Sequence, residues 1–527
     1  MKRKESFIFG LAMLLTIVSK AQWVPSVAFN SMSPQHRDWR ITGQPDHGYF
    51  SILSTGSFMA SNTLVHPATW LTSSYGQSSP QVDLNSIFED FAGSNVVEAN
   101  ASITLFSAGF FPGKKRNTFI EFVASENVQA GFEVPADLLQ LPFAGNATFN
   151  DADAATIDLT PLDASLSHFR SFGIGFQHVF GECLSAGMRI HRLHGFHHLD
   201  IEENEWGLTT NAADWSWNLQ GGGRFVSSGL NSVYRAQALG QMDSLVHSVT
   251  NRSPSLRNKG WGFDAGVEMQ WTKRWTSWFQ FNKGGTIHWT NDVLVYEVED
   301  FDWGLDGFDA TNGGNGWVNG ASSLLDSLQL WAEHELEAIE EYHTISKTND
   351  SYVSKLPNRV VSGVEYHFLR GARDGELSMG GIIEHVVGRP TSWNIAVNAR
   401  FGNGLQSTLT YGKRFGLVST AGLSLAIPLG PFLVFAAAEG HQAIDWSHFN
   451  VVHDDEFVNW NMPTNAPYIG LQAGCVWRLK WREPKSEPQA SPLTPSLNST
   501  RSPVFDIDVQ PDDRHKRQQQ CVLPGKS

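Results

Sequence analysis

The chain has 527 residues, of which only 17% are charged, and it contains 48 Gly, 34 Phe and 19 Trp. This composition is unusual for a soluble enzyme of that length, and it is typical of a protein that presents aromatic residues to both interfaces of a bilayer. The formal net charge of −15 argues against nucleic acid and against an anionic membrane surface as partners.

The N-terminus predicts a secretory signal peptide over residues 1–21. Three basic residues precede a short apolar core, and Ser19 and Ala21 then place small residues before a cleavage site. Residues 1–21 carry four basic side chains and one acidic one, so their removal changes the net charge from −15 to −18. We expect residues 22–47 to form an N-terminal periplasmic segment.

Strand-like alternation is the dominant pattern in the rest of the chain. From Trp261 to Trp271 every odd position is apolar and every even position is Gly, Asp, Glu or Gln. No later stretch approaches the ~18 consecutive apolar residues of a spanning helix, whereas strands of about ten residues suffice to cross a bilayer. The pattern predicts about fourteen strands, near 48–57, 97–111, 116–131, 168–180, 184–202, 260–271, 274–290, 358–369, 376–386, 392–401, 404–412, 417–427, 431–439 and 467–481.

These strands predict an all-β fold, a transmembrane antiparallel β-barrel over residues 48–482 in the outer membrane, with the membrane lipid as its partner. An even strand number puts both ends of the barrel in the periplasm. The connections then sort into two classes by length. Short periplasmic turns are expected at 181–183, 272–273, 402–403 and 428–430, and long outer segments at 132–167, 203–259, 291–357 and 440–466.

Two segments lack the strand pattern. Residues 321–346 place apolar side chains at helical spacing between glutamates, which predicts an amphipathic helix in a long outer loop. Residues 483–527 hold seven prolines among many polar residues, which predicts a disordered periplasmic tail. We expect the tail to be the part of the chain that could bind a periplasmic protein.

Two clusters of histidine and acidic residues have the side chains of a metal site, the first around His191 and the second around His453. Alternation along a strand separates the members of the first cluster onto two faces, so at most two histidines and one acid could converge. The second has no calcium-loop motif, although calcium needs 6–8 converging oxygens. Solvated residues at strand ends and loops are therefore the favoured interpretation, and no metal is expected. The first cluster is His191, His194, His197 and His198 with Asp200, Glu202 and Glu203; the second is His453, Asp454, Asp455 and Glu456 with His441 and His448.

No enzyme signature is present: the chain lacks a GxSxG elbow, an HExxH pair and a P-loop. We therefore expect neither catalysis nor a cofactor. If the apolar stripes face lipid, the opposite positions line the lumen, where they either serve a passage or satisfy one another's hydrogen bonds. The lumen-lining candidates are Asp264, Glu268, Gln270, Gln280, Asn282, Asn394, Asn398, Arg400, Arg478 and Lys480.

A family resemblance rests on the stretch Asn-Lys-Gly-Trp-Gly-Phe-Asp-Ala-Gly at 258–266, on residues 275–289, on Ser-Leu at 327–328 and on Leu-Pro-Asn-Arg at 356–359. Over most of residues 45–481 the chain resembles a family of Bacteroidota outer-membrane barrels of uncharacterised function. It departs from that family at Asn282, where the family often has Asp.

A second resemblance lies at residues 61–68, Ser-Asn-Thr-Leu-Val-His-Pro-Ala. The segment is similar to an Asn-Pro-Ala stretch near the start of long-chain fatty-acid transporter barrels, with His66 in place of the Asn. The resemblance implies a transporter or channel for a small or hydrophobic ligand. The alternative is a structural barrel that anchors a surface or secretion assembly. A narrow, plugged lumen would favour the anchor, and a lateral opening near Pro67 would favour transport.

Overall fold

The computed structural model describes residues 24–62, 71–72, 81–82, 95–113, 115–139, 154–181, 183–211, 217–230, 258–305, 345–371, 375–401, 404–414, 418–441, 446–453, 456–463 and 468–479. The predicted signal peptide, the tail at 483–527 and nearly all of the predicted loop helix at 321–346 lie outside these residues. Within them, no helix is both long and apolar enough to span a membrane.

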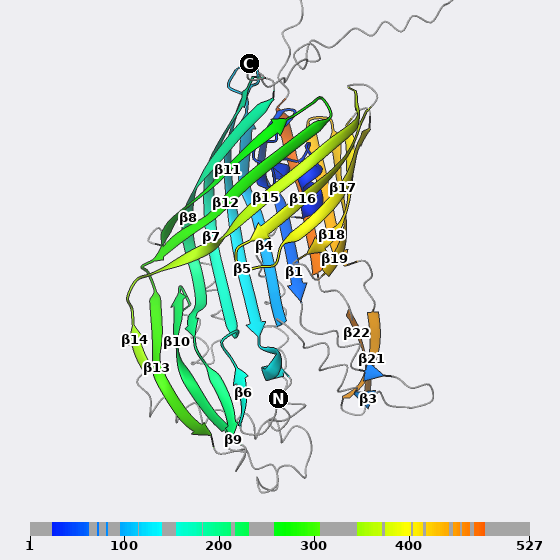
Figure 1. The fold of residues 1–527 in the computed structure, drawn as a ribbon. Helices are drawn as coiled ribbons and strands as arrows, with labels where there is room; N and C mark the ends of the chain where they lie inside the picture. Colours follow the sequence, from blue (N-terminus) through cyan, green and yellow to red (C-terminus); the bar gives the residue numbers. More distant parts are fainter. Residues whose placement is uncertain are drawn as a thin grey trace, which may run out of the picture.

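Fourteen antiparallel strands close into one barrel, which confirms the predicted fold class (Figure 1). The first and last strands complete the ring by pairing from Gly48↔Leu479 to Ser61↔Tyr468. Every strand between them pairs with its two neighbours along the barrel. The barrel strands are β1 (Gly48–Asn62), β4 (Asn95–Phe110), β5 (Thr118–Val134), β7 (Asp163–Phe180), β8 (Leu184–Asn204), β11 (Lys259–Gln270), β12 (Trp275–Trp289), β15 (Tyr352–Gly371), β16 (Gly375–Val386), β17 (Ser392–Phe401), β18 (Leu405–Arg414), β19 (Val418–Leu429), β20 (Phe432–His441) and β23 (Tyr468–Leu479).

The strand pattern reflects two different environments. On β11, Trp261, Phe263 and Val267 are 58%, 40% and 49% exposed on the outside, whereas Asp264 between them is buried on the inside. Exposed aromatic and aliphatic side chains recur around the outer wall in the same way. An apolar band of this kind matches a bilayer, because lipid tails and not water must cover it.

Short turns lie at one end of the barrel, whereas the other end carries the long connections together with the two short ones after β16 and β18. β1 begins and β23 ends at the same rim, together with the turns after β4, β7, β11 and β19 (Figure 1). Gly181 and Gly430 occupy two of these turns with φ of +62° and +60°, a conformation that favours glycine. The long connections leave from the opposite rim. We call the first rim the inner end and the second the outer end.

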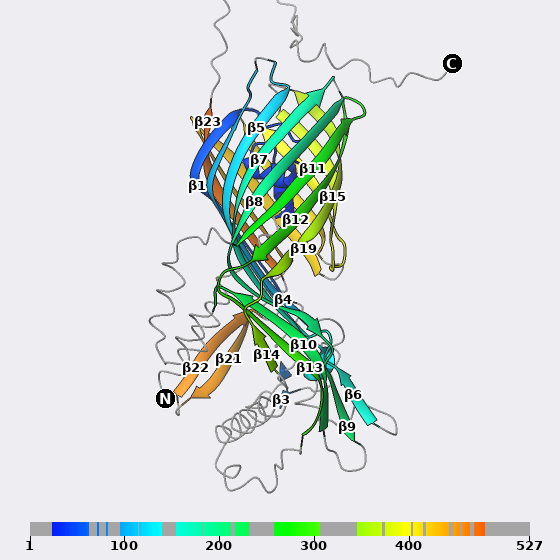
Figure 2. The same ribbon diagram turned by 90° about the vertical axis from the view of Figure 1, so that its left-hand side faces the viewer.

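A sheet extension beyond the outer end was not predicted. β10 (Trp217–Ser228) and β13 (Val293–Leu305) pair at length, and β9 (Gly207–Asn211), β6 (Ala154–Asp158) and β14 (Ile345–Thr348) widen the extension (Figure 2). The sequence analysis had assigned these residues to long loops. The extension has a core of its own, built on Ile157, Leu159 and Leu208. Two further hairpins are β2 (Leu71–Thr72) with β3 (Gln81–Val82), and β21 (Trp446–His453) with β22 (Glu456–Pro463).

The N-terminal segment differs most from expectation. The sequence analysis placed residues 22–47 in the periplasm, but residues 24–43 lie inside the barrel as two short 3-10 helices, η1 (Pro25–Phe29) and η2 (Pro34–Asp38) (Figure 1). Most of their side chains are buried, and Trp39 and Ile41 are completely so. We call residues 24–43 the plug.

Candidate functional site

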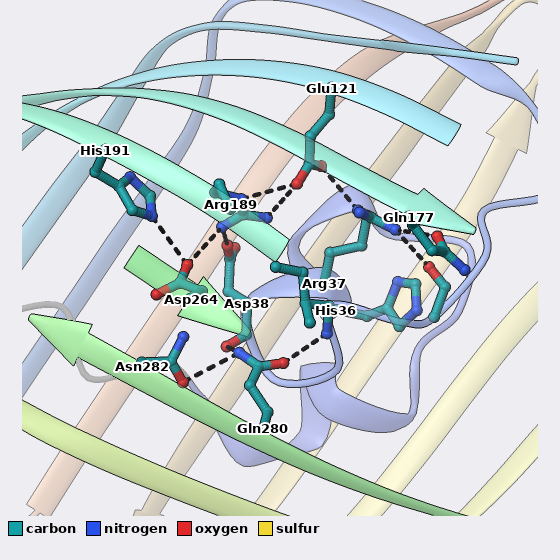
Figure 3. A network of polar contacts seen from close by, with 12 residues as sticks. His36, Arg37, Asp38, Glu121, Gln177, Arg189, His191, Asp264, Gln280 and Asn282 are labelled. Carbon is teal, nitrogen blue, oxygen red and sulfur yellow. Dashed lines mark hydrogen bonds and ion pairs between the residues drawn. The ribbon is translucent and has the colours of Figure 1, made fainter. Parts of the chain in front are cut away.

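The centre of the lumen is an ion-pair network between the plug and the wall (Figure 3). Arg37 donates from Nε to Oε2 of Glu121 over 2.8 Å and from Nη1 to Oε1 of Gln177 over 2.6 Å. Arg189 of β8 donates from Nε to the other oxygen of Glu121 over 2.8 Å and from Nη1 to Asp38 over 2.7 Å. Glu121 on β5 is therefore shared between one arginine of the plug and one of the wall.

A second group of ion pairs holds the end of the plug. Arg40 forms two hydrogen bonds with Glu268 and one with Glu365, each 2.9 Å long. The hydroxyl of Thr42 donates to the same Glu268 carboxylate over 2.9 Å. These side chains are only 6–17% exposed in the ion pairs, so water screens them poorly. The plug thus supplies an arginine to two wall carboxylates that are largely shielded from water.

Backbone groups of the plug also bond to the wall. Oε1 of Gln280 accepts from the amide of Ile41 over 2.5 Å, and its Nε2 donates to the carbonyl of Asp38 over 3.0 Å. On the other side of the lumen, Gln406 accepts from the amide of Met32 and donates to the carbonyl of Phe29, both over 3.1 Å. A short helical segment inside a barrel needs such partners, because its backbone groups cannot join the sheet.

Apolar contacts also anchor the plug: Val24 and Val27 cluster with Ala437, and a larger cluster lies around Phe29. Phe29 meets the ring of Trp278 edge-on, with 5.8 Å between the ring centroids, and Ala28 and Trp39 join the same cluster. Gly380 makes room for this contact, since a Cβ there would lie 2.4 Å from Phe29. The plug is therefore held by small apolar clusters and by many polar contacts.

Burial shifts the ionisation of two plug residues. It lowers the pKa of His36 to about 3, with further lowering from the nearby Arg40 and Arg37. It raises the pKa of Asp38 to about 6, against the opposing attraction of Arg189. Acid therefore acts on the plug in two opposite ways: protonation of His36 disfavours the docked position, whereas protonation of Asp38 favours it.

A cavity of about 220 Å³ lies between the plug and the wall on the side of the outer end. Pro34, Gln35 and Asp38 of the plug form part of its lining. Hydroxyl and amide side chains from β5 line it together with apolar side chains from other strands. They include Ser125, Asn127 and Gln129 on β5, and Phe169, Leu193 and Leu356 on β7, β8 and β15.

The lumen-lining candidates lie at several separate places in the barrel. Asp264, Glu268, Gln280 and Asn282 lie in or beside the central network, where Asp264 accepts from Nε2 of His191 over 2.9 Å. Asn398 belongs to a separate group that reaches the plug through Gln406.

The two arginines among these candidates lie apart from the network. Arg400 pairs with Asp46 at an exposed position, and Arg478 donates to the carbonyl of Gly430 at the inner rim. Gln270 and Asn394 form no described contact with the plug, and Lys480 lies outside the described residues.

The sequence analysis missed the plug and several of its wall partners. Glu121, Arg189, Glu365 and Arg359 are buried charged residues on strands that were predicted correctly, but their significance depends on what fills the lumen. A usable signal was the sequence Arg-Asp-Trp-Arg at 37–40. A solvated linker has no partners for two arginines and a tryptophan, so these residues just before the first strand indicate contacts with the barrel.

The first metal candidate, around His191, is not assembled. His191 bonds to Asp264 and Ser171, whereas His198 bonds to Tyr352. Within the described part of the chain, no group of three or more His, Cys, Asp or Glu side chains is placed to hold a metal ion. The side chains of the second cluster, around His453, lie outside the described residues.

Comparison with known proteins gives a family but no function. Residues 43–439 match the model of a family of unknown function, DUF5723, and the chain belongs to this family. No curated protein matches.

The solved structures that the chain is similar to are distant. The monoaromatic hydrocarbon channel TodX (deltaS2 mutant) is 9% identical, with 84% of this chain and 93% of that chain covered and a TM-score of 0.37. A Pseudomonas aeruginosa FadL homologue is also 9% identical, with 88% and 98% covered and a TM-score of 0.37. The translocator domain of the autotransporter NalP from Neisseria meningitidis is 8% identical, with 84% and 94% covered and a TM-score of 0.28.

Proposed function

We propose that the protein is an outer-membrane channel for a small ligand, and that the plug is its gate. The observation that carries the proposal is the way the lumen is closed. Barrels of about eight strands can be filled by their own side chains, whereas larger ones enclose channels. In this fourteen-strand barrel a separate segment of the chain, held mainly by polar contacts, occupies the interior.

Polar contacts suit a gate because water can replace them. When the plug moves, Glu121, Glu268 and Glu365 lose their plug arginines, but water entering the lumen solvates both partners. A lumen closed by the interlocking side chains of its own wall could not open in this way. The plugged lumen therefore supports gated transport here, although a plugged lumen in general would favour an anchoring role.

The cavity bears on the size and chemistry of the ligand. At about 220 Å³ it is smaller than the ~300–1,000 Å³ of pockets for drug-sized molecules. Its wall combines hydroxyl and amide groups of β5 with Phe169, Leu193 and Leu356. A small ligand with both polar and apolar groups fits this lining best.

Uptake by proteoliposomes tests the proposal, with small solutes graded in size and polarity. Ser125→Trp fills the cavity from the lumen, and Ala124→Trp adds the same side chain at the neighbouring position, which faces outward. We expect Ser125→Trp to reduce uptake and Ala124→Trp to leave it unchanged. Equal uptake by both variants and the wild type would contradict passage through the cavity, and so would an absence of uptake for every solute.

A second function is supported by the sheet extension. β10 and β13 project beyond the barrel as a continuous sheet with its own core, which gives the outer surface a rigid platform. We propose attachment of a surface assembly as the alternative function, with the tail at 483–527 as a periplasmic attachment site. Deletion of 483–527 separates the two functions. Loss of function with unchanged solute uptake would support attachment.

A further inference from the structure

The outward face of four neighbouring strands carries a row of basic side chains. Across β7, β8, β11 and β12, Arg170 lies opposite His194, His194 opposite Lys259, and Lys259 opposite His288. Lys259 and His288 are exposed, and the Arg170 side chain is 28% exposed. We call these four residues the basic row.

Aromatic contacts show that the row faces the outside of the barrel. The His194 ring meets Phe172 edge-on at 5.7 Å, and Phe172 is 45% exposed on the outer wall. One step toward the inner end, the guanidinium of Arg192 lies 4.6 Å over the ring of Trp261, which is 58% exposed. Nη1 of Arg192 also donates to the carbonyl of Gly260 over 3.5 Å, and the remaining N–H groups of a guanidinium stacked in this way can bind an anion.

The row is short of negative charge. Glu126 pairs with Arg170 over 2.6 Å and with His168 over 2.7 Å. Among the described residues, no carboxylate lies within ion-pair distance of Arg192 or Lys259. Nδ1 of His194 has no hydrogen-bond partner, and Arg170, Arg192 and Lys259 all lie close enough to act on His194 electrostatically.

Such an arrangement is unfavourable unless an anion neutralises it. Arg192 and Lys259 are diagonal neighbours on β8 and β11, and like charges on neighbouring strands destabilise a sheet when their side chains can approach each other. The chain as a whole is acidic, with a net charge of −15, so the basic row is a local reversal of the overall charge.

We infer that the basic row, together with Arg192, binds the phosphate of an anionic lipid headgroup in the outer leaflet. The row lies where the apolar band ends on β7, β8 and β11, next to the exposed Phe172, Ile190 and Trp261. A membrane lipid can place its acyl chains on these side chains and its phosphate on the cations at the same time. A soluble anion would use the cations alone. The inference relies on the outer-membrane location and not on transport.

The test uses the full chain in nonionic detergent and native mass spectrometry. The probes are lipid A with both phosphates, the same lipid A after dephosphorylation, and inorganic phosphate. The test variant is Arg192→Gln/Lys259→Gln. The matched control is Lys413→Gln on β18, an exposed outward lysine that also lies opposite a tryptophan, Trp393.

We expect the wild type to prefer the phosphorylated lipid and the double variant to bind it about thirty-fold more weakly, since each of the two cations contributes roughly fivefold near a membrane surface. Lys413→Gln should bind like the wild type. Equal binding of both lipids, an unaffected double variant or an equally weakened Lys413→Gln would overturn the inference. Displacement of the lipid by millimolar phosphate would also overturn it, in favour of a soluble anion.

Two controls separate binding from folding and from transport. The mobility of unheated protein on a gel reports whether the double variant forms a barrel, and Lys259→Gln alone serves if it does not. Without lipid, the double variant should be at least as stable as the wild type, because two repelling charges have been removed. Solute uptake is not measured in this experiment, so failure of the channel proposal and failure of the lipid inference are distinguishable.

Discussion

Replacement of Arg40 by Gln tests how the plug is held. Arg40 donates three hydrogen bonds of 2.9 Å to Glu268 and Glu365, and its guanidinium also lies 4.6 Å over the ring of Trp278. In Arg40→Gln both carboxylates remain buried without their cation when the plug is docked. When the plug moves away, water can solvate them, so the substitution favours the undocked state.

The size of the effect follows from the burial of the pair. Removal of one partner of a buried ion pair costs about 3–5 kcal/mol. Because about 1.4 kcal/mol corresponds to a factor of ten, the docked population should fall relative to the undocked one by a factor on the order of 10²–10³. The exposed pair between Arg400 and Asp46 is the matched control. Its side chains are 29% and 44% exposed, and such a pair contributes about 1 kcal/mol or less.

Thiol labelling measures the undocked population. Ser26 is completely buried in the plug, so Ser26→Cys reacts with a soluble maleimide only when the plug moves, in a background with Cys183, Cys475 and Cys521 replaced by Ser. We expect labelling about 100-fold faster or more in Arg40→Gln and within about fivefold of the parent in Arg400→Gln. Addition of Glu268→Gln and Glu365→Gln to Arg40→Gln should recover most of the loss. Similar labelling rates in Arg40→Gln and Arg400→Gln would refute the argument.

Three further predictions concern the plug and the barrel. Burial lowers the pKa of His36 from about 6.5 to about 3, so the undocked plug binds the proton more tightly and docking weakens as the pH falls through this window. In His36→Gln the labelling rate should therefore rise less on acidification than in its parent. An identical pH profile of the two proteins would contradict this prediction. Asp38 acts in the opposite direction below its pKa of about 6, which is why the difference between His36→Gln and its parent is the informative quantity. Phe29→Ala removes the apolar contact with Trp278 and should weaken docking by about 3–5 kcal/mol. The far-ultraviolet circular dichroism spectrum should stay unchanged. A loss of the strand signal would show that the barrel itself needs the plug to fold. The unheated wild type should migrate differently from the heated protein on a denaturing gel, and identical mobility would contradict a closed barrel.

The barrel was predictable because each strand repeats one simple contrast. Side chains such as Trp261 and Phe263 face lipid, and Asp264 faces the interior, so the period of two is present in every strand long enough to cross a bilayer. Strand number and the positions of both barrel ends follow from that pattern alone. The extension strands β10 and β13 lack this contrast, since no lipid covers them, and they were assigned to loops.

The contents of the lumen were not predictable from alternation. The pattern on β11 indicates that Asp264 and Glu268 face inward, but it does not reveal that Glu268 meets Arg40 across 228 residues of sequence. Such a contact depends on a segment that has no regular pattern itself. To predict such contacts, the inward-facing charged residues of the strands must be compared with opposite charges in the segment before the first strand. The pairs Arg37 with Glu121 and Arg40 with Glu268 are examples of this match.

The most direct test of the gate is the conductance of a single channel whose plug can be locked and released. Gln35 in the plug donates to the hydroxyl of Thr55 in β1 over 2.6 Å, so cysteines at these two positions can be joined by a short bifunctional methanethiosulfonate cross-linker. In a planar bilayer, the cross-linked Gln35→Cys/Thr55→Cys protein, with Cys183, Cys475 and Cys521 replaced by Ser, should show no open events, and reductive cleavage of the cross-link should restore brief openings like those of the uncross-linked protein. Equal conductance before and after reduction would contradict a gate formed by the plug.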